Sequence, residues 1–163
     1  MKKLDQQVPI VTGAAQGIGR SIADELALAG AHIAVFDLNL EAAQAAAAEI
    51  AKLGVTARGY AVDVSQSKVV DEAFAQVVSD FGRLDILINN AGISMVGPHI
   101  KDLTNEVWDL SLGVMQSGVF YCMRAATKYL LPQRSGSVVT SLLSAVSLLI
   151  QEELHTAQPK LQS

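Results

Sequence analysis

Short apolar runs alternate with longer helical segments along most of this 163-residue chain. Strands that alternate with helices in this way are typical of parallel sheets joined by crossover helices. The predicted strands span residues 8–11, 32–36, 57–62, 84–88 and 137–140, and the predicted helices span residues 17–29, 40–53, 68–81 and 104–131. The sequence therefore predicts an α/β fold with a doubly wound parallel sheet of about five strands.

Single residues support these boundaries. Gly30 and Gly54 follow predicted helices, where a left-handed residue often ends a helix. Asn39 and Thr104 stand at positions where a helix N-cap is expected. Pro9 conflicts with a central strand, because its missing N–H would interrupt the ladder of hydrogen bonds. We therefore place Pro9 at the start of the first strand.

The composition excludes several classes of protein. There are 12 basic and 16 acidic residues and no basic cluster, so the charge pattern expected of a nucleic-acid-binding protein is missing. Cys122 is the single cysteine, and no Cys or His spacing suits a metal. The longest nearly apolar run, residues 142–150, is much shorter than the roughly 20 residues that span a bilayer. The polar residues after Lys3 do not suit a signal peptide. We expect a cytoplasmic protein that acts on small molecules.

A glycine-rich turn follows the first predicted strand and begins the first predicted helix. It contains Gly13, Gly17 and Gly19 in the segment Thr-Gly-Ala-Ala-Gln-Gly-Ile-Gly. Glycines at such a junction let the backbone turn tightly and approach a pyrophosphate, which binds the free amides at the helix N-terminus. A glycine cluster alone is also compatible with an ordinary strand-to-helix turn.

Asp37 makes the prediction of a dinucleotide-binding turn more specific. It ends the second predicted strand 18 residues after Gly19, close to the roughly 20 expected of an acid that binds the adenosine ribose. The alternative role of Asp37, a helix cap, is already filled by Asn39. A carboxylate repels a 2′-phosphate, and neither Ala15 nor Leu38 supplies an arginine to bind one. The sequence therefore favours NAD over NADP.

With these motifs in place, residues 8–140 resemble the classical short-chain dehydrogenase/reductase family, whose fold is Rossmann-like. The glycine spacing is that of the family, and the resemblance continues in Asp63-Val64 and in the run Asn89 to Gly92. Taken singly, Asp63 is compatible with a turn residue and Asn89 with a cap. The resemblance implies hydride transfer between NAD and an alcohol or carbonyl compound. The implied cofactor-binding residues are Gly13, Gln16, Gly17, Ile18, Gly19, Asp37, Asp63, Val64, Asn90, Ala91 and Gly92.

Three of the four catalytic positions of the family are not matched in this chain. The family uses an asparagine, a serine, and a tyrosine followed four residues later by a lysine. Alignment places Met115, Leu143, Thr156 and Lys160 at these positions. A thioether cannot join a proton relay, and a threonine cannot donate a proton near neutral pH. We therefore expect no catalytic residue, and we expect no metal ligand.

The chain is predicted to have two parts, an NAD-binding domain over residues 1–140 and a tail over residues 141–163 that departs from the family pattern. We expect the tail to be irregular. We favour the hypothesis of a one-base deletion near codon 140, because codons compatible with the tail give a family-like active-site segment in the shifted frame. Natural divergence and deliberate trimming are the alternatives.

The resemblance leaves two functions open. One is an NAD-dependent oxidoreductase, as expected of intact relatives. The other is a non-catalytic chain that binds NAD, or a truncated product that is unstable. In the second case the last strands and helices of the sheet are missing, and the homo-oligomer that is usual in the family is lost or impaired. We favour the second for this chain.

Overall fold

The computed structural model describes residues 2–93 and 100–141, which contain one five-stranded parallel sheet. The strands are β1 (Pro9–Thr12), β2 (Ile33–Asp37), β3 (Ala57–Ala61), β4 (Ile86–Asn89) and β5 (Ser137–Thr140). Their order in the sheet is β3-β2-β1-β4-β5, and every neighbouring pair is parallel. The predicted doubly wound α/β fold is confirmed.

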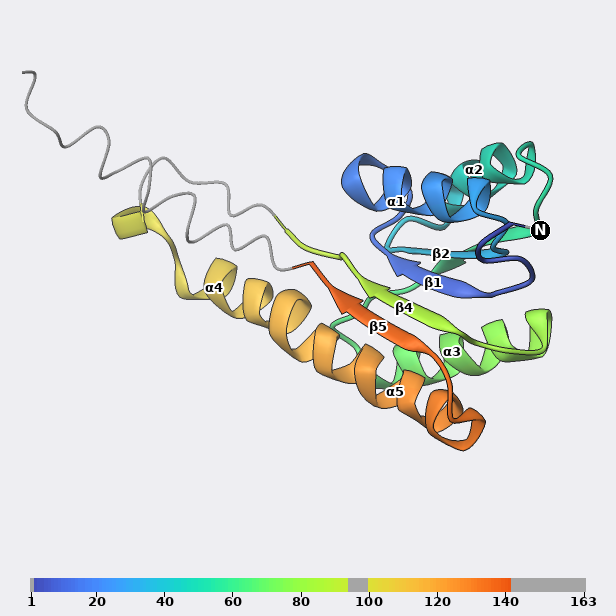
Figure 1. The fold of residues 1–163 in the computed structure, drawn as a ribbon. Coiled ribbons are helices and arrows are strands. Elements are labelled where there is room, and N and C mark those ends of the chain that lie inside the picture. The colour runs from blue at the N-terminus through green and yellow to red at the C-terminus, as the bar shows by residue number, and fades with distance from the viewer. Residues whose placement is uncertain (1, 94–99, 142–163) are drawn as a thin grey trace, which may run out of the picture.

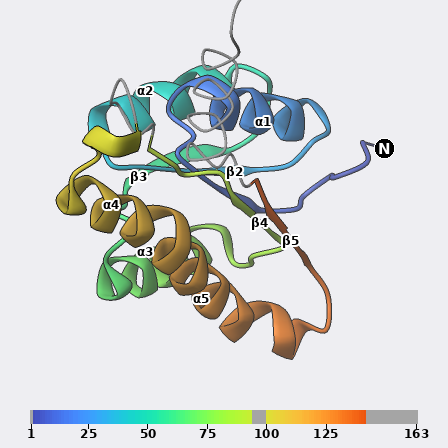
Figure 2. The same cartoon turned by 90° about the vertical axis from the view of Figure 1, so that its left-hand side faces the viewer.

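Helices cover both faces of this sheet (Figure 1). They are α1 (Gly17–Leu28), α2 (Leu40–Ala51), α3 (Ser67–Phe81), α4 (Asn105–Leu112) and α5 (Gly118–Gln133), with a short 3-10 turn, η1 (Ile100–Asp102), and a π-helical segment, η2 (Gly113–Ser117). Figure 2 shows α1 and α2 on one side of the sheet and α3 and α5 on the other. No helix within the described residues is both long and apolar enough to cross a membrane.

The two faces of the sheet bury different kinds of side chain. Alanines of α1 and α2, such as Ala23 and Ala43, pack on Ile33 and Val35 of β2. On the opposite face, Phe36 packs edge-on against Phe74 of α3. Because side chains alternate across a strand, β2 contributes to both layers and is buried on both faces.

The predicted helix boundaries are largely confirmed. The Asn39 side chain accepts a hydrogen bond from the Ala42 amide at 3.1 Å, and the Thr104 hydroxyl accepts one from the Val107 amide at 3.4 Å. Both residues therefore act as N-caps. Gly30 and Gly54 have φ angles of +101° and +85°, as expected after helix ends.

Pro9 begins β1, as predicted, and the buried Asp85 completes the ladder beside it. The Val8 amide donates to the Asp85 carboxylate at 2.9 Å. The Val8 carbonyl accepts from the amides of Asp85 and Ile86. Arg83 binds the same carboxylate through two nitrogens, at 2.7 and 2.6 Å. The chain thus meets the hydrogen-bonding needs of this strand end without an amide from Pro9.

The prediction of one continuous α-helix over residues 104–131 was wrong at its centre. The structure has α4, then η2, then α5. Glycine at both boundaries of η2, Gly113 and Gly118, weakens the α-helical preference there. Gly118 also packs so closely on Val64 that an added Cβ would lie 2.9 Å from its Cγ2. A wider turn therefore forms where the helix passes closest to the segment after β3.

Candidate cofactor site

The candidate site lies at the carboxyl ends of β1 and β4. These strands are neighbours, yet the chain leaves β1 toward β2 and β3 on one side, while β5 lies on the other side of β4. The loops that follow β1 and β4 therefore diverge, and such a topological switch point is where open α/β sheets bind ligands. The glycine turn follows β1, and the run Asn89 to Gly92 covers the end of β4 and the residues after it.

Glycines shape the turn for two separate reasons. Gly13 and Gly17 have φ angles of +62° and +58°, which residues with a side chain rarely adopt. Gly19 is required by contact instead, because an added Cβ would lie 2.3 Å from the Gly13 carbonyl oxygen and 2.4 Å from the Asn90 amide nitrogen. The first turn of α1 can therefore press against the loop after β4.

The N-terminus of α1 has no side-chain cap. Gln16 occupies the N-cap position without a side-chain hydrogen bond, and the first turn carries no acidic residue. The positive end of the helix dipole and the first-turn amides are thus left for an anion. The side chain of Ile18 is 59% exposed at this point.

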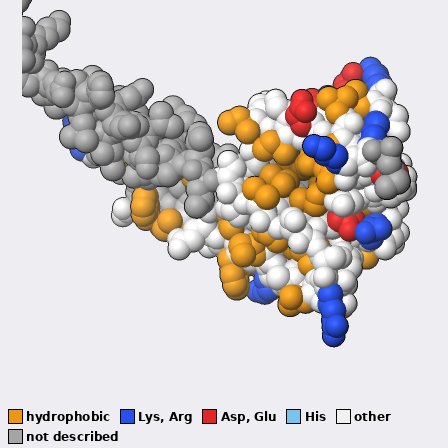
Figure 3. Space-filling model, viewed as in Figure 1, with side chains coloured by type: hydrophobic (Ala, Val, Ile, Leu, Met, Phe, Trp, Pro, Cys, Tyr) orange, Lys and Arg blue, Asp and Glu red, His pale blue; other side chains and the backbone are white. Residues whose placement is uncertain are grey.

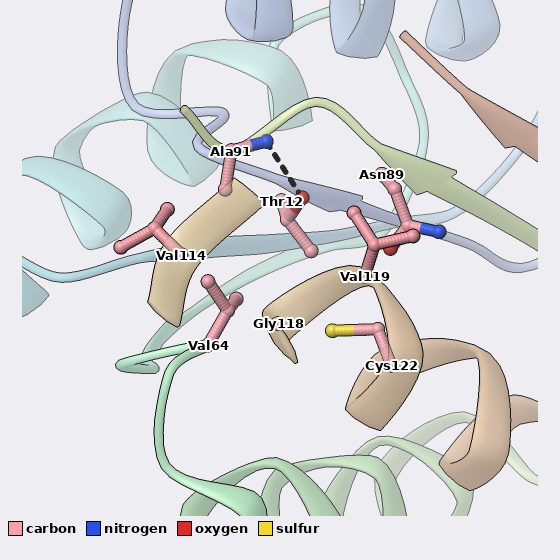
Figure 4. Close-up of a pocket in the computed structure, with 8 residues that line it drawn as sticks. All are labelled: Thr12, Val64, Asn89, Ala91, Val114, Gly118, Val119 and Cys122. Atoms are coloured by element: carbon pink, nitrogen blue, oxygen red, sulfur yellow. Dashed lines mark hydrogen bonds between the residues drawn. The ribbon is translucent and has the colours of Figure 1, made fainter. Parts of the chain in front are cut away.

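Thr12 and Asn90 join the two loops of the site. The Thr12 hydroxyl accepts from the amides of Asn90 and Ala91 at 3.0 and 2.9 Å, and the Ala91 contact is drawn in Figure 4. The Asn90 side chain donates to the Thr12 carbonyl at 3.0 Å and to the Gly13 carbonyl at 3.3 Å. Thr12 was not among the residues predicted for the site from the sequence. Its position between the first predicted strand and the first glycine of the turn could have indicated this role.

Asp37 lies beside the glycine turn. One carboxylate oxygen accepts from the Ala15 amide at 3.1 Å, and the other accepts from the Asn39 amide at 3.2 Å. Each oxygen of an ionised carboxylate can accept further hydrogen bonds. The two backbone contacts orient the side chain and leave it able to accept from sugar hydroxyls.

The segment after β3 runs next to Asp37, since the Val62 amide donates to the Asp37 carbonyl at 2.7 Å. The Asp63 carboxylate accepts from the amide and the hydroxyl of Ser65, at 2.9 and 2.6 Å. Asp63 therefore holds a turn, the alternative role considered from the sequence. Val64 is buried and packs on Gly118.

Asn89 and Gly92 do not share the contacts that Asn90 and Ala91 make with Thr12. The buried Asn89 side chain donates to the Thr140 hydroxyl at 3.3 Å, which links β4 to β5. An added Cβ on Gly92 would lie 3.9 Å from its nearest neighbour, the Asn90 carbonyl oxygen. Glycine is therefore not required at position 92 by contacts within the described residues.

A shallow hollow lies beneath these loops, between the sheet and α5 (Figure 4). It is lined by Thr12, Val64, Asn89, Ala91, Val114, Gly118, Val119 and Cys122. Burial raises the pKa of the Cys122 thiol to about 12, so the thiol is protonated near neutral pH and is a poor nucleophile.

The predicted catalytic positions are only partly within the structure. Met115 lies in η2, while Leu143, Thr156 and Lys160 lie outside the described residues, as do residues 142–163 of the predicted tail. No group of three or more acidic, histidine or cysteine side chains within residues 2–93 and 100–141 is placed to hold a metal ion.

Comparisons with known proteins agree with this fold. The short chain dehydrogenase family matches residues 7–148. D-threitol dehydrogenase of Mycolicibacterium smegmatis is 38% identical over 152 residues, which cover 93% of this chain and 58% of that protein. The 2,3-dihydro-2,3-dihydroxybenzoate dehydrogenase of Bacillus subtilis is 38% identical over 139 residues, which cover 85% and 53%.

Solved structures show the same likeness. NAD⁺-bound xylitol dehydrogenase superposes with a TM-score of 0.82 at 34% identity, covering 85% of this chain and 54% of that one. Carveol dehydrogenase from Mycobacterium avium in complex with NAD gives a TM-score of 0.80 at 27% identity, covering 86% and 55%. The chain belongs to the short-chain dehydrogenase family, and it spans about half the length of the relatives it matches.

Proposed function

We propose that this chain binds NAD at the glycine turn and does not itself catalyse hydride transfer. The observation that carries the proposal is the position of Asp37. Its carboxylate accepts from the Ala15 amide at 3.1 Å, so the acid lies directly against the glycine turn. A pyrophosphate at the N-terminus of α1 and an adenosine ribose at Asp37 fit this arrangement.

The residues proposed to hold NAD fall into groups. The amides of Gly17, Ile18 and Gly19 face the pyrophosphate, and Gly13 and Gln16 shape the turn around it. Asp37 accepts from the ribose hydroxyls, and Asp63 and Val64 border the adenine. Asn90, Ala91 and Gly92 border the part of the site toward β4. Bound NAD supplies a nicotinamide ring that accepts or gives a hydride.

Charge supports the choice of NAD over NADP. A carboxylate at the ribose position repels a 2′-phosphate. Neither Ala15 nor Leu38 offers a basic group there, and Arg20 on α1 is engaged by Asp24 at 2.9 Å. Both xylitol dehydrogenase and carveol dehydrogenase, which share this fold, were solved with NAD.

The absence of turnover is proposed from the residues at the family's catalytic positions. Met115 stands in place of the asparagine, and Leu143 and Thr156 stand in place of the serine and the tyrosine. None of the three can exchange a proton with a substrate oxygen near neutral pH. The intact relatives are oxidoreductases of alcohols and carbonyl compounds, and the same substrate class is proposed for an intact form of this chain.

Isothermal titration calorimetry with NAD and NADP tests the binding. We expect NAD to bind more tightly than NADP. Asp37→Ala should weaken NAD binding by about 10- to 100-fold, since a hydrogen bond to a charged group contributes about 1.5–3 kcal/mol. The same substitution should reduce the difference in affinity between NAD and NADP. Asp71→Asn is the matched control, because Asp71 lies on α3 across the sheet from α1 and pairs with Lys128 at 2.7 Å.

An activity screen of the same protein against simple alcohols tests the second half of the proposal. Binding without turnover is the expected result. Measurable reduction of NAD would contradict the proposed lack of catalysis while leaving the binding site intact. A chain that gives no cooperative folding transition would instead support the remaining alternative, an unstable product.

A further inference from the structure

The backbone of α2 lies directly against Gly59 of β3. A Cβ added to Gly59 would overlap the carbonyl group of Ala43 and lie 2.5 Å from the amide nitrogen of Gln44. Gly59 has no positive φ angle, so the conformation of the strand would accept an alanine. The contact with α2 therefore requires glycine at this position, and the backbone conformation does not.

This contact lies in a closed interface between α2 and the sheet. The helix packs on β2 and β3 (Figure 2), and its side chains Ala43, Ala46, Ala47 and Ile50 are buried. The face of the molecule shown in Figure 3, by contrast, exposes hydrophobic side chains. An atom added between α2 and β3 therefore displaces the first turn of α2 from the sheet.

The same turn of α2 is bonded to Asp37, the acid proposed to bind the ribose. The Ala43 amide donates to the Asn39 carbonyl at 3.0 Å, and the Ala42 amide donates to the Asn39 side chain at 3.1 Å. The Asn39 amide in turn donates to one oxygen of the Asp37 carboxylate at 3.2 Å. A displacement of this turn therefore moves a donor that orients the carboxylate.

We propose that Gly59 is a positioning residue for the Asp37 carboxylate, an inference that rests on the proposed NAD site. With glycine at this position, α2 lies close enough to the sheet for the Asn39 amide to reach Asp37. The second carboxylate oxygen accepts from the Ala15 amide, and the two contacts together fix the direction of the remaining lone pairs. A side chain at position 59 leaves the carboxylate oriented by the Ala15 contact alone.

A double-mutant cycle measured by calorimetry with NAD tests this role in the full chain. Gly59→Ala should weaken NAD binding by about 3- to 10-fold, a part of the loss expected for Asp37→Ala. In the Asp37→Ala background, Gly59→Ala should change the affinity by less than about 2-fold, because the carboxylate that it positions is absent. Equal fold-changes in the two backgrounds would overturn the proposal and leave Gly59 a packing residue only.

Ile50→Val is the matched control for the stability of α2. It removes one carbon from the same interface at the other end of the helix, where Ile50 is buried, whereas Gly59→Ala adds one. With folded protein at the temperature of the titration, Ile50→Val should keep the NAD affinity within about 2-fold of the unsubstituted value. A loss equal to that of Gly59→Ala would assign the effect to helix stability and overturn the proposal.

Asn39→Ala tests the same link without adding an atom to the sheet. It removes the side-chain cap and loosens the first turn of α2, while keeping the amide that donates to Asp37. NAD binding should weaken by about 2- to 5-fold, and this loss should disappear in the Asp37→Ala background. If Gly59→Ala does not fold, this cycle decides the proposal, and an equal loss in both backgrounds would overturn it.

The unsubstituted chain and Asp37→Ala separate this inference from the proposed function. NAD binding that is weakened by Asp37→Ala and unaffected by Gly59→Ala would overturn the role of Gly59 and leave the NAD site in place. No saturable binding of NAD to the folded unsubstituted chain would overturn the proposed function, and the role of Gly59 with it.

Discussion

At the scale of single residues, the site depends on three glycines that a residue with a side chain could replace only with strain. Gly13 and Gly17 are needed for their backbone conformation, whereas Gly19 is needed because α1 begins in contact with the Gly13 carbonyl and the Asn90 side chain. Thr12 holds the same two loops from the strand side through three hydrogen bonds. The phosphate-binding turn is therefore preorganised by its neighbours.

We predict that Gly19→Ala destabilises the fold by about 1–3 kcal/mol, the usual cost of an added group in a well-packed place. The new Cβ would lie 2.3 Å from the backbone oxygen of Gly13, so α1 must move away from the loop after β4. Chemical denaturation measures the change. Gly92→Ala is the control, and with its nearest neighbour among the described residues at 3.9 Å it should change the stability by less than about 0.5 kcal/mol. Equal effects of the two substitutions would contradict the packing explanation.

The sequence was informative for residues whose role is set by backbone geometry. Gly30, Gly54, Asn39 and Thr104 could be predicted because caps and left-handed positions depend on local order. Asp85 could not, because its role arises from contact between strands far apart in the chain. Asn90 was predicted as a cofactor-binding residue, and that role stays a prediction. Its side chain binds the glycine turn, a contact that spacing does not reveal.

At the scale of secondary structure, the passage from α4 to α5 is the least regular part of the fold. The apolar periodicity predicts one helix there, because each segment is helical by itself. A π-helical segment of five residues is too short to change the apparent period of the sequence. The close approach of Gly118 to Val64 is a tertiary contact and carries no local signal. The strands were predictable to within one or two residues because apolar runs bounded by turns identify them directly.

Paired alanine substitutions at the two ends of η2 test this explanation. Gly118→Ala should lower the free energy of unfolding by about 1–3 kcal/mol, since its Cβ would lie 2.9 Å from Val64 Cγ2 and 3.2 Å from the Val64 carbonyl oxygen. Gly113→Ala should be neutral or stabilising, because its Cβ would lie 3.6 Å from Ser65 and alanine favours a helix over glycine by roughly 0.5–1 kcal/mol. Thermal and urea denaturation of both variants measure the difference. Destabilisation by Gly113→Ala alone would show that the backbone of η2, and not its contact with Val64, sets the geometry.

At the scale of the whole molecule, the sheet has two edges of different character. β3 ends one side with Arg58 paired to Asp80 at 3.2 Å, and charge of this kind discourages edge pairing. β5 ends the other side of the described sheet without a charged residue. The cofactor site lies between these edges, at the ends of β1 and β4, so its geometry depends on the central strands rather than on β5.

The proposed NAD site consists of the glycine turn and Asp37 together. The most direct measurement is a titration of the ¹⁵N-labelled chain with NAD, followed by amide chemical shifts. We expect saturable shifts at residues 13–19 and 37–39, with β5 and the C-terminal half of α5 unchanged. Saturable shifts confined to other segments, or no shifts at millimolar NAD from a folded chain, would contradict it.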